Sequence, residues 1–180
     1  KLAFADGLGH ITDPNNMVVN VGELISKKYA DQRRALIKPN KALFQPSSGV
    51  DVPQGDTVYI SCVDGYGNAC SLINSIFSGF GTGLVVPGTG IVLQNRGSSF
   101  SLNPEHPNAW APNKRPFHTL MPGMITSADK LWLSYGVMGA IQQAQGHLQV
   151  LVNMVDFDLN PQEALDAPRF SVRPEEGIAI

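Results

Sequence analysis

The stretch DTVYISCVDGYGNACSLINSI, residues 56–76, decides the fold of this chain. β-Branched and apolar residues fill TVYISCVD (57–64) and ACSLINSI (69–76), and the glycine- and asparagine-containing segment GYGN (65–68) separates them. A tight turn between two such runs is typical of a two-stranded hairpin. We therefore predict two antiparallel strands here, and we expect the first strand to begin at Thr57.

The residues before this hairpin predict a helix and a linker. Residues 21–37 carry apolar side chains at helical spacing among charged ones, which predicts one amphipathic surface helix. Residues 39–55 are rich in proline and have no clear period, which is the composition of an extended linker. The glycine-rich stretch 77–90 lacks the G-K-[ST] ending of a phosphate-binding loop, so we expect an ordinary loop there.

The second half of the chain alternates strand and helix signals. FHTLMPGMIT (117–126) and KLWLSYGV (130–137) predict two strands around a Ser-Ala-Asp turn. Residues 141–157 have apolar residues at helical spacing, and we expect this helix to pack on a sheet. Asn160 followed by Pro161 predicts the capped start of a final short helix. Hairpins followed by helices indicate an α+β fold.

Composition excludes several classes of partner. The chain has 180 residues, of which 43% are hydrophobic and 16% are charged, with a net charge of -2. A chain of this size and composition can form one domain with a substantial core. It has no basic surplus to neutralise a phosphate backbone, so we expect no nucleic-acid partner. No apolar run reaches the roughly 18 residues that a membrane span needs, so we expect no span in this segment.

The residues that most often bind metals do not form a recognisable metal motif. No histidine is followed four residues later by a ligand residue, and the two cysteines lie in strand-like runs without C-x-x-C spacing. We therefore expect neither a metal site nor a catalytic thiol. The residues concerned are His10, His106, His118, His147, Cys62 and Cys70.

A specific order of motifs points to one family. A strand led by Thr57 is followed by a D-x-x-G-N turn (64–68), FGTGLVVPGTGIVLQN (80–95), PNKRP (112–116) and NPQEALDAPRF (160–170). In this order the motifs resemble the region around the maturation site of γ-glutamyltranspeptidases. The resemblance covers nearly the whole chain, and it implies part of the αββα four-layer sandwich of N-terminal-nucleophile hydrolases.

The resemblance also implies a division of the chain and a self-cleavage. Residues 1–56 correspond to the end of the large subunit, and residues 57–180 to the small-subunit catalytic region. The implied cleavage lies between Asp56 and Thr57, and it gives Thr57 a free α-amine that can act as the base for its own hydroxyl. No cofactor is needed for this chemistry. The implied partners are the remaining portion of the large subunit and a small-molecule γ-glutamyl or related acyl amide.

Three further residues take catalytic roles by this resemblance. Ser75 occupies the place of a hydroxyl residue that hydrogen-bonds the nucleophile. Gly139 and Ala140 occupy the place of a Gly-Gly pair whose backbone N–H groups form the oxyanion hole. Because alanine adopts positive φ angles less readily than glycine, we expect Ala140 to keep this role only with a negative φ.

The acyl-binding positions depart from typical transpeptidases. By this resemblance, Phe77 occupies the place of an asparagine, and Ser99 that of an acid that binds the substrate ammonium. His118 and Thr119 occupy the places of two serines that bind the substrate carboxylate. Arg96 lies in the loop near the acyl pocket. This pattern resembles the transpeptidase-like and cephalosporin-acylase-like branch of the family.

Three functions remain open from the sequence. The first is a γ-glutamyltranspeptidase-like amidohydrolase or acyltransferase that acts on γ-glutamyl amides such as glutathione. The second is an acylase for glutaryl-type amides. The third is an uncleaved, inactive relative that acts as a binding or structural protein.

Overall fold

The structure is a computed structural model that describes residues 1–41, 55–173 and 177–179. Most of the predicted linker, residues 42–54, lies outside the described part. Contacts within the chain define two compact units. The first comprises residues 1–50, 97–118 and 174–177, and the second comprises residues 51–96, 119–173 and 178–180.

The first unit contains three helices: α1 (Leu2–His10), α2 (Val21–Leu24) and α3 (Lys27–Arg34). The prediction of one helix over 21–37 is therefore wrong. The chain leaves helical geometry before Ser26, whose Oγ accepts the Tyr29 N–H at 3.1 Å and caps α3. Serine favours such a cap over a helix interior, because its hydroxyl satisfies an N–H that has no partner within the helix.

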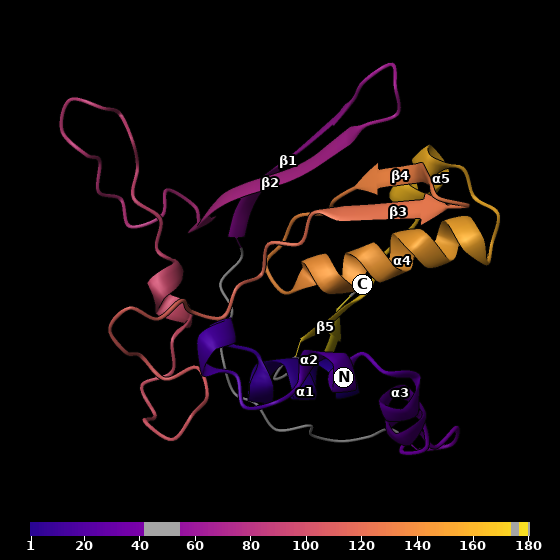
Figure 1. The fold of residues 1–180 in the computed structure, drawn as a ribbon, viewed down its shortest axis with the longest axis horizontal. Coiled ribbons are helices and arrows are strands. Elements are labelled where there is room, and N and C mark those ends of the chain that lie inside the picture. Colours follow the sequence, from indigo (N-terminus) through magenta and orange to yellow (C-terminus); the bar gives the residue numbers. More distant parts are fainter. Residues whose placement is uncertain (42–54, 174–176, 180) are drawn as a thin grey trace. The chain divides into compact units, whose positions relative to one another are not determined.

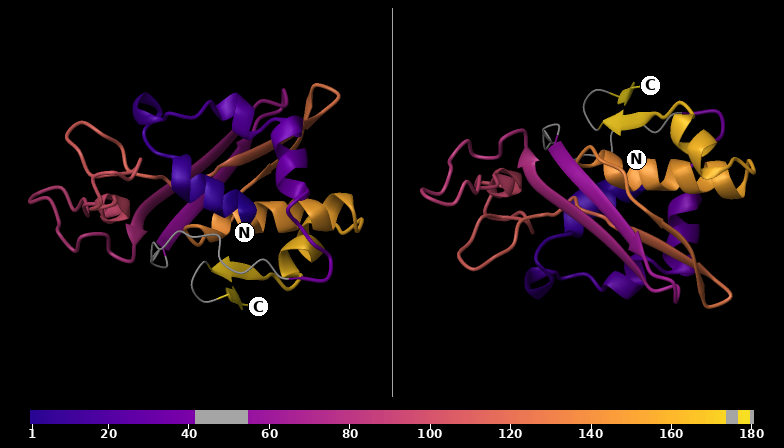
Figure 2. Two further views of the ribbon diagram at one scale, coloured as in Figure 1. Left: turned by 90° about the horizontal axis from the view of Figure 1, so that it is seen from below. Right: turned by 90° about the horizontal axis from the view of Figure 1, so that it is seen from above.

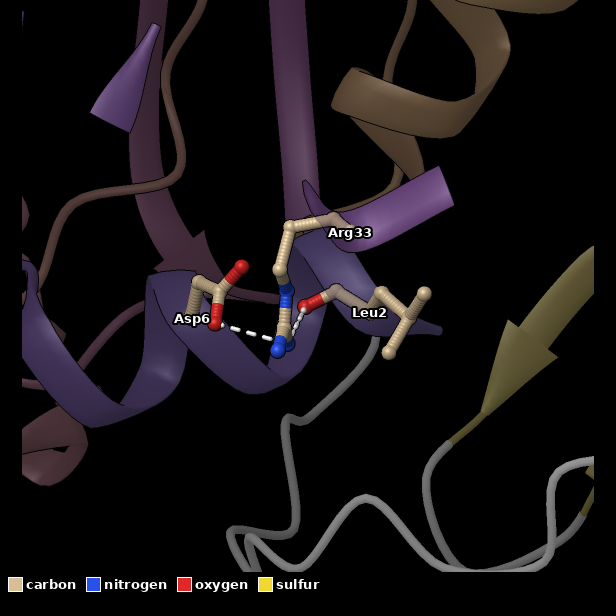
Figure 3. A network of polar contacts seen from close by, with 3 residues as sticks. All are labelled: Leu2, Asp6 and Arg33. Atoms are coloured by element: carbon tan, nitrogen blue, oxygen red, sulfur yellow. Dashed lines mark hydrogen bonds and ion pairs between the residues drawn. The ribbon is translucent and has the colours of Figure 1, made fainter. Parts of the chain in front are cut away.

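An ion pair joins α1 to α3 (Figure 3). Arg33 Nη2 lies 2.8 Å from Asp6 Oδ1, and the same nitrogen donates to the carbonyl oxygen of Leu2 at 3.3 Å. Both side chains are partly shielded from solvent. The arginine thus binds a side chain and a backbone carbonyl of α1 together.

Asn108 joins three segments of the first unit by hydrogen bonds. Its Oδ1 accepts the Thr12 hydroxyl at 3.2 Å and the Phe117 N–H at 2.9 Å, while its Nδ2 donates to the Ser99 carbonyl at 2.7 Å. Ser99 Oγ also donates to the Phe117 carbonyl at 3.0 Å. These bonds fix the loop that carries Ser99 and His118.

The second unit begins with the predicted hairpin, which the structure confirms. Strands β1 (Gly55–Val63) and β2 (Ala69–Ser78) pair antiparallel, with Cys62 opposite Cys70. In the turn between them, the Asp64 carboxylate accepts the N–H groups of Tyr66 and Asn68, each at 2.9 Å. The expected start of the first strand is corrected, because β1 begins at Gly55 and runs through Thr57.

A second hairpin is formed by β3 (Gly123–Ser127) and β4 (Lys130–Tyr135). Its turn residues Ala128 and Asp129 have φ angles of 47° and 61°, which matches the twist of the flanking strands. The prediction of a strand from residue 117 is wrong for residues 117–122. Bonds to side chains take the place of ladder bonds here, as where Met121 N–H donates to Gln143 Oε1 at 3.0 Å.

Both predicted helices of the second unit are confirmed. Helix α4 spans Gln142–Val155, and α5 spans Pro161–Asp166 with a complete capping box between Asn160 and Glu163. Within this unit the β3–β4 hairpin lies between the β1–β2 hairpin and α4 (Figure 1). The expected packing of this helix on a sheet is thus also confirmed.

Side-chain hydroxyls join the two hairpins, which run beside each other in Figure 2. Tyr59 Oη lies 2.8 Å from both Ser71 Oγ and Ser134 Oγ, and Ser71 Oγ donates to the Gly123 carbonyl at 2.9 Å. Hairpins packed with helices confirm the α+β class. Among the described residues, no helix combines the length and apolar character of a membrane span.

The last strands, β5 (Ser171–Arg173) and β6 (Gly177–Ala179), form a small sheet of their own. The Gln145 amide of α4 bonds the backbone of β5 as another strand would. It donates to the Val172 carbonyl at 3.1 Å and accepts the Val172 N–H at 2.7 Å. Helix α4 thus holds β5 through a side-chain amide.

Candidate active site

Thr57 lies at an irregularity in the first hairpin. Asp56 pairs with Phe77 and Thr57 pairs with Ser75, so Ile76 is an extra residue on β2 opposite the Asp56–Thr57 bond. Such a β-bulge bends its strand and changes the direction of neighbouring side chains. Thr57 is only 7% exposed. The bulge therefore bends β2 directly opposite the predicted nucleophile.

Phe77 has a strained backbone beside this bulge. Its φ is 79°, a value that bulky residues rarely adopt, and its side chain is 1% exposed. A left-handed backbone costs a non-glycine residue about 1–2 kcal/mol. In this conformation the Phe77 N–H donates to Ser75 Oγ at 2.9 Å. The strain thus helps to fix the hydroxyl of the residue opposite the predicted nucleophile.

Arg96 places a buried positive charge in the same region. Its side chain is 5% exposed, and its Cζ lies 4.7 Å from the centre of the Phe77 ring. Nη1 donates to Thr119 Oγ1 at 2.9 Å, and Nη2 donates to Ser75 Oγ at 3.3 Å. Burial lowers the pKa of the Arg96 guanidinium, but arginine remains protonated in proteins. We call Thr57, Ser75, Phe77, Arg96 and Thr119 the nucleophile corner.

The bonds to Ser75 determine the direction of its own proton. A serine hydroxyl has two acceptor lone pairs and one donor proton. The Phe77 N–H and Arg96 Nη2 occupy both acceptor positions. Through these two bonds Ser75 acts as an acceptor, and its single proton is the only group with which this hydroxyl can donate.

The predicted oxyanion residues precede α4. We call residues 136–140 the oxyanion segment. Gly139 has a φ of 109° and Ala140 a φ of 53°, so the negative φ on which we made the donor role of Ala140 depend is not present. Alanine tolerates the left-handed region at a cost of about 1–2 kcal/mol, and Ala140 is held there at 3% exposure. The carbonyls of Gly139 and Ala140 accept the N–H groups of Gln142 and Gln143 at 2.9 and 3.1 Å.

Close packing fixes this segment on both sides. A Cβ added to Gly136 would lie 2.4 Å from Tyr59 Cδ2, so the Tyr59 ring rests directly on the Gly136 backbone. A Cβ added to Gly146 of α4 would lie 2.7 Å from Val137 Cγ2. Because Tyr59 follows Thr57 by two residues in β1, the strand of the predicted nucleophile also supports the oxyanion segment.

The predicted site residues divide between the two units. The nucleophile corner, Gly139 and Ala140 belong to the second unit, whereas Ser99 and His118 belong to the first. Sequence reasoning missed Tyr59 and the buried Gln143. Their signals were a tyrosine two residues after the predicted nucleophile and the polar run QQAQGH (142–147) in an otherwise apolar helix. Within the described residues, no group of three or more His, Cys, Asp or Glu side chains could hold a metal ion.

The fold and the site together define the class of protein. The chain matches the crystal structure of cephalosporin acylase from Bacillus halodurans with a TM-score of 0.84 and 48% identity, covering 94% of this chain and 30% of that chain. Its elements are thus part of an N-terminal-nucleophile hydrolase fold. The family model described as gamma-glutamyltranspeptidase matches residues 1–176. The chain belongs to the γ-glutamyltranspeptidase family.

Two curated relatives show the range of the family. The glutathione hydrolase-like YwrD proenzyme of Bacillus subtilis is 38% identical over 170 residues, covering 94% of this chain and 32% of the relative. The oxamate amidohydrolase proenzyme of Klebsiella pneumoniae is 40% identical over 170 residues, with the same coverage of 94% and 32%. The chain thus spans about a third of the length of these relatives.

Proposed function

We propose that this chain carries the catalytic region of a γ-glutamyltranspeptidase-like amidohydrolase or acyltransferase that acts on γ-glutamyl amides such as glutathione. The observation that carries the proposal is the position of Thr57. It is buried at a β-bulge and paired with Ser75, whose hydroxyl is held by Phe77 and Arg96. Family membership supports the same chemistry.

The first step is self-cleavage between Asp56 and Thr57. The Thr57 hydroxyl oxygen attacks the Asp56 carbonyl carbon, the amide C–N bond breaks, and the hydroxyl proton passes to the released nitrogen. Water then hydrolyses the resulting ester, which leaves a carboxylate on Asp56 and restores the Thr57 hydroxyl beside a free α-amine. Residues 1–56 become the end of a large subunit, and residues 57–180 become the catalytic region of a small subunit.

In turnover the Thr57 α-amine takes the hydroxyl proton while the oxygen attacks the substrate amide. The N–H groups of Gly139 and Ala140 stabilise the tetrahedral oxyanion, and Ser75 donates to the nucleophile oxygen. The amine product leaves with a proton, and water or a second amine then accepts the acyl group from Thr57. These steps require no cofactor.

A second candidate is favoured by Arg96. A substrate ammonium near this buried cation would be disfavoured by the like charge. An acyl chain that ends in a carboxylate would instead be attracted. Relatives named as cephalosporin acylase and oxamate amidohydrolase indicate that the family includes amidases for acyl groups other than γ-glutamyl. Carboxylate-bearing acyl amides of the glutaryl type are therefore the second substrate class.

Substitution of Thr57 tests the proposed chemistry in the full-length protein. We expect Thr57→Ala to stay as one polypeptide and to lose turnover, while Thr57→Ser retains part of both activities, because only the hydroxyl and the α-amine are required. Intact mass and p-nitroanilide release measure the two effects. Cleavage of Thr57→Ala at this bond would contradict the assignment. A wild-type protein that remains uncleaved and inactive would instead support a binding or structural role.

A substrate comparison separates the two substrate classes. Because, by the family resemblance, Phe77 and Ser99 take the places of an asparagine and an ammonium-binding acid, we expect glutaryl and γ-glutamyl p-nitroanilides to differ by less than about tenfold in kcat/KM, or about 1.4 kcal/mol. A γ-glutamyl preference of several orders of magnitude would exclude the acylase class.

Arg96→Met tests the role of the cation in this choice. We expect it to reduce the kcat/KM of the glutaryl substrate relative to the uncharged pentanoyl substrate by about tenfold or more, because the carboxylate loses its partner. Arg34→Met is the matched control, since the Arg34 side chain is 70% exposed on α3. An unchanged ratio in Arg96→Met would show that Arg96 does not select the acyl group.

A further inference from the structure

His147 supports the oxyanion segment from α4. Its Nε2 accepts the Val137 N–H at 3.2 Å, and its ring lies 4.7 Å from the Tyr135 ring, centroid to centroid. Val137 is two residues before Gly139. The preceding residue, Gly136, is pressed against Tyr59, and Gly146 is packed against Val137. The imidazole therefore fixes the backbone just where it turns toward the two predicted oxyanion donors.

This bond exists only with a neutral imidazole. A backbone N–H can only donate, so Nε2 must carry a lone pair and the proton must lie on Nδ1. In the protonated ring both nitrogens are donors, and Nε2 would face the Val137 N–H without an acceptor. Burial holds the pKa of His147 below its ordinary value of about 6.5. The bond is therefore intact at neutral pH.

Among the described residues of the second unit, few charged groups lie around His147. Tyr135 of β4 touches the ring, and burial raises the pKa of Tyr135, so its phenol is neutral in the acid range. Tyr59 of β1 reaches the adjacent Gly136. The charged residues on the elements that pack against α4 are Lys130 of β4, Glu163 and Asp166 of α5 and Arg173 of β5.

The carboxylates of α5 accept hydrogen bonds from residues of the same helix or its cap. Glu163 accepts the Asn160 N–H at 2.9 Å, and Asp166 accepts from the Gln162 amide at 3.0 Å. Lys130 is exposed at the start of β4, five positions before Tyr135. Desolvation is accordingly the cause that lowers the pKa of His147.

We propose that His147 is a positioning residue for the oxyanion hole, and that its protonation in acid releases the Val137 backbone and weakens catalysis. The inference rests on the proposed function, because it assigns a purpose to the Gly139 and Ala140 amides. The direction of this pH effect follows from the linkage between protonation and folding. The folded state prefers neutral His147, so this contribution is fully present above the unfolded pKa and is lost as the pH falls through the folded one.

Two variants test the activity in the full-length protein. His147→Gln keeps an acceptor that cannot be protonated, and His147→Leu removes the acceptor. Near neutral pH we expect His147→Leu to lower kcat about tenfold with little change in KM, as when an interaction used in the transition state is lost. His147→Gln should keep most of the wild-type kcat. His10→Gln on α1 is the matched control.

The pH profile separates this role from a merely structural one. In the wild type, protonation of the Thr57 α-amine removes the base and protonation of His147 lowers activity further by about tenfold, so log kcat/KM should fall with a slope above one over about one pH unit in acid. In His147→Gln the slope should be about one. Equal slopes in the two proteins, or a wild-type kcat in His147→Leu, would overturn the proposal.

A measurement without turnover distinguishes failure of this inference from failure of the proposed function. Hydrogen exchange of the Val137 amide in Thr57→Ala protein should lose protection as His147 protonates, and in the double variant with His147→Gln it should not. If this holds while the wild-type protein shows no turnover, the proposed function fails and the support of the segment stands. If protection is independent of pH in both proteins, the role of His147 is wrong.

Discussion

The nucleophile corner and the oxyanion segment are built in opposite ways. The corner depends on side chains, since the Arg96 guanidinium bonds the Ser75 and Thr119 hydroxyls and lies against the Phe77 ring. The oxyanion segment depends on its backbone, which is shaped by positive φ angles and by glycines that lie against neighbouring atoms. Side chains fix the direction of a proton in one region, and sterics fix the direction of N–H groups in the other.

This difference predicts whether a substitution in each region changes mainly the catalytic chemistry or mainly the stability. In the nucleophile corner, removing one polar atom changes the chemistry and leaves the packing of the hairpins in place. In the oxyanion segment, adding one carbon atom displaces the backbone and lowers the free energy of unfolding. Both regions use β1, which provides Thr57 for one and Tyr59 for the other.

Ser75→Ala should have the largest effect of the single substitutions that test this comparison. The variant removes a donor to the nucleophile, so we expect kcat to fall up to about a hundredfold, or about 2.7 kcal/mol, with KM little changed. Ser61→Ala is the control, because Ser61 lies on the same strand pair and bonds Ser134 at 2.9 Å. A wild-type kcat in Ser75→Ala would remove this residue from the site.

The same variant probes the bonds around the hydroxyl. Ser75→Ala leaves the Phe77 N–H and Arg96 Nη2 without this acceptor, and we expect the free energy of unfolding to fall by about 1 kcal/mol. Denaturant unfolding measures it. A loss above about 3 kcal/mol would show that the corner carries much of the stability and would blur its contrast with the oxyanion segment.

Gly136→Ala should act mainly on stability. The new Cβ would meet the Tyr59 ring at 2.4 Å, so the ring or the segment must move, at a cost of about 1–3 kcal/mol. We expect a lower melting temperature together with a lower kcat. Gly65→Ala is the matched control, because a Cβ there meets nothing within 4 Å. Equal stability of the two variants would contradict the close contact between Gly136 and Tyr59.

Ala140→Gly should have the smallest effect. Glycine adopts a φ of 53° without strain, but it loses a buried methyl group worth about 0.8 kcal/mol. The two contributions oppose each other, so we expect a change below about 1 kcal/mol and retained activity. Ala140→Val should be much less stable, because β-branched residues are poorly tolerated at positive φ. Thermal unfolding of the pair distinguishes backbone strain from simple packing as the property that matters at this position.

The sequence by itself determined the elements whose signals are local. The hairpin over 57–76 follows from two apolar runs around a turn, α4 follows from helical spacing, and α5 follows from the box formed by Asn160 and Glu163. These features depend on residues within a few positions of one another, so a short window contains all the information that they need. The order of motifs likewise indicated the family, and the family model confirms it.

Only the tertiary structure decided how the site is held. The bulge opposite the Asp56–Thr57 bond and the contacts of Arg96 join residues about 20 positions apart in the sequence. The positive φ of Phe77 occurs beside this bulge. The left-handed φ of Ala140 went against its local preference, because burial before α4 outweighs a cost of about 1–2 kcal/mol. Such conformations are set by packing between distant segments, and no local pattern records which segments will meet.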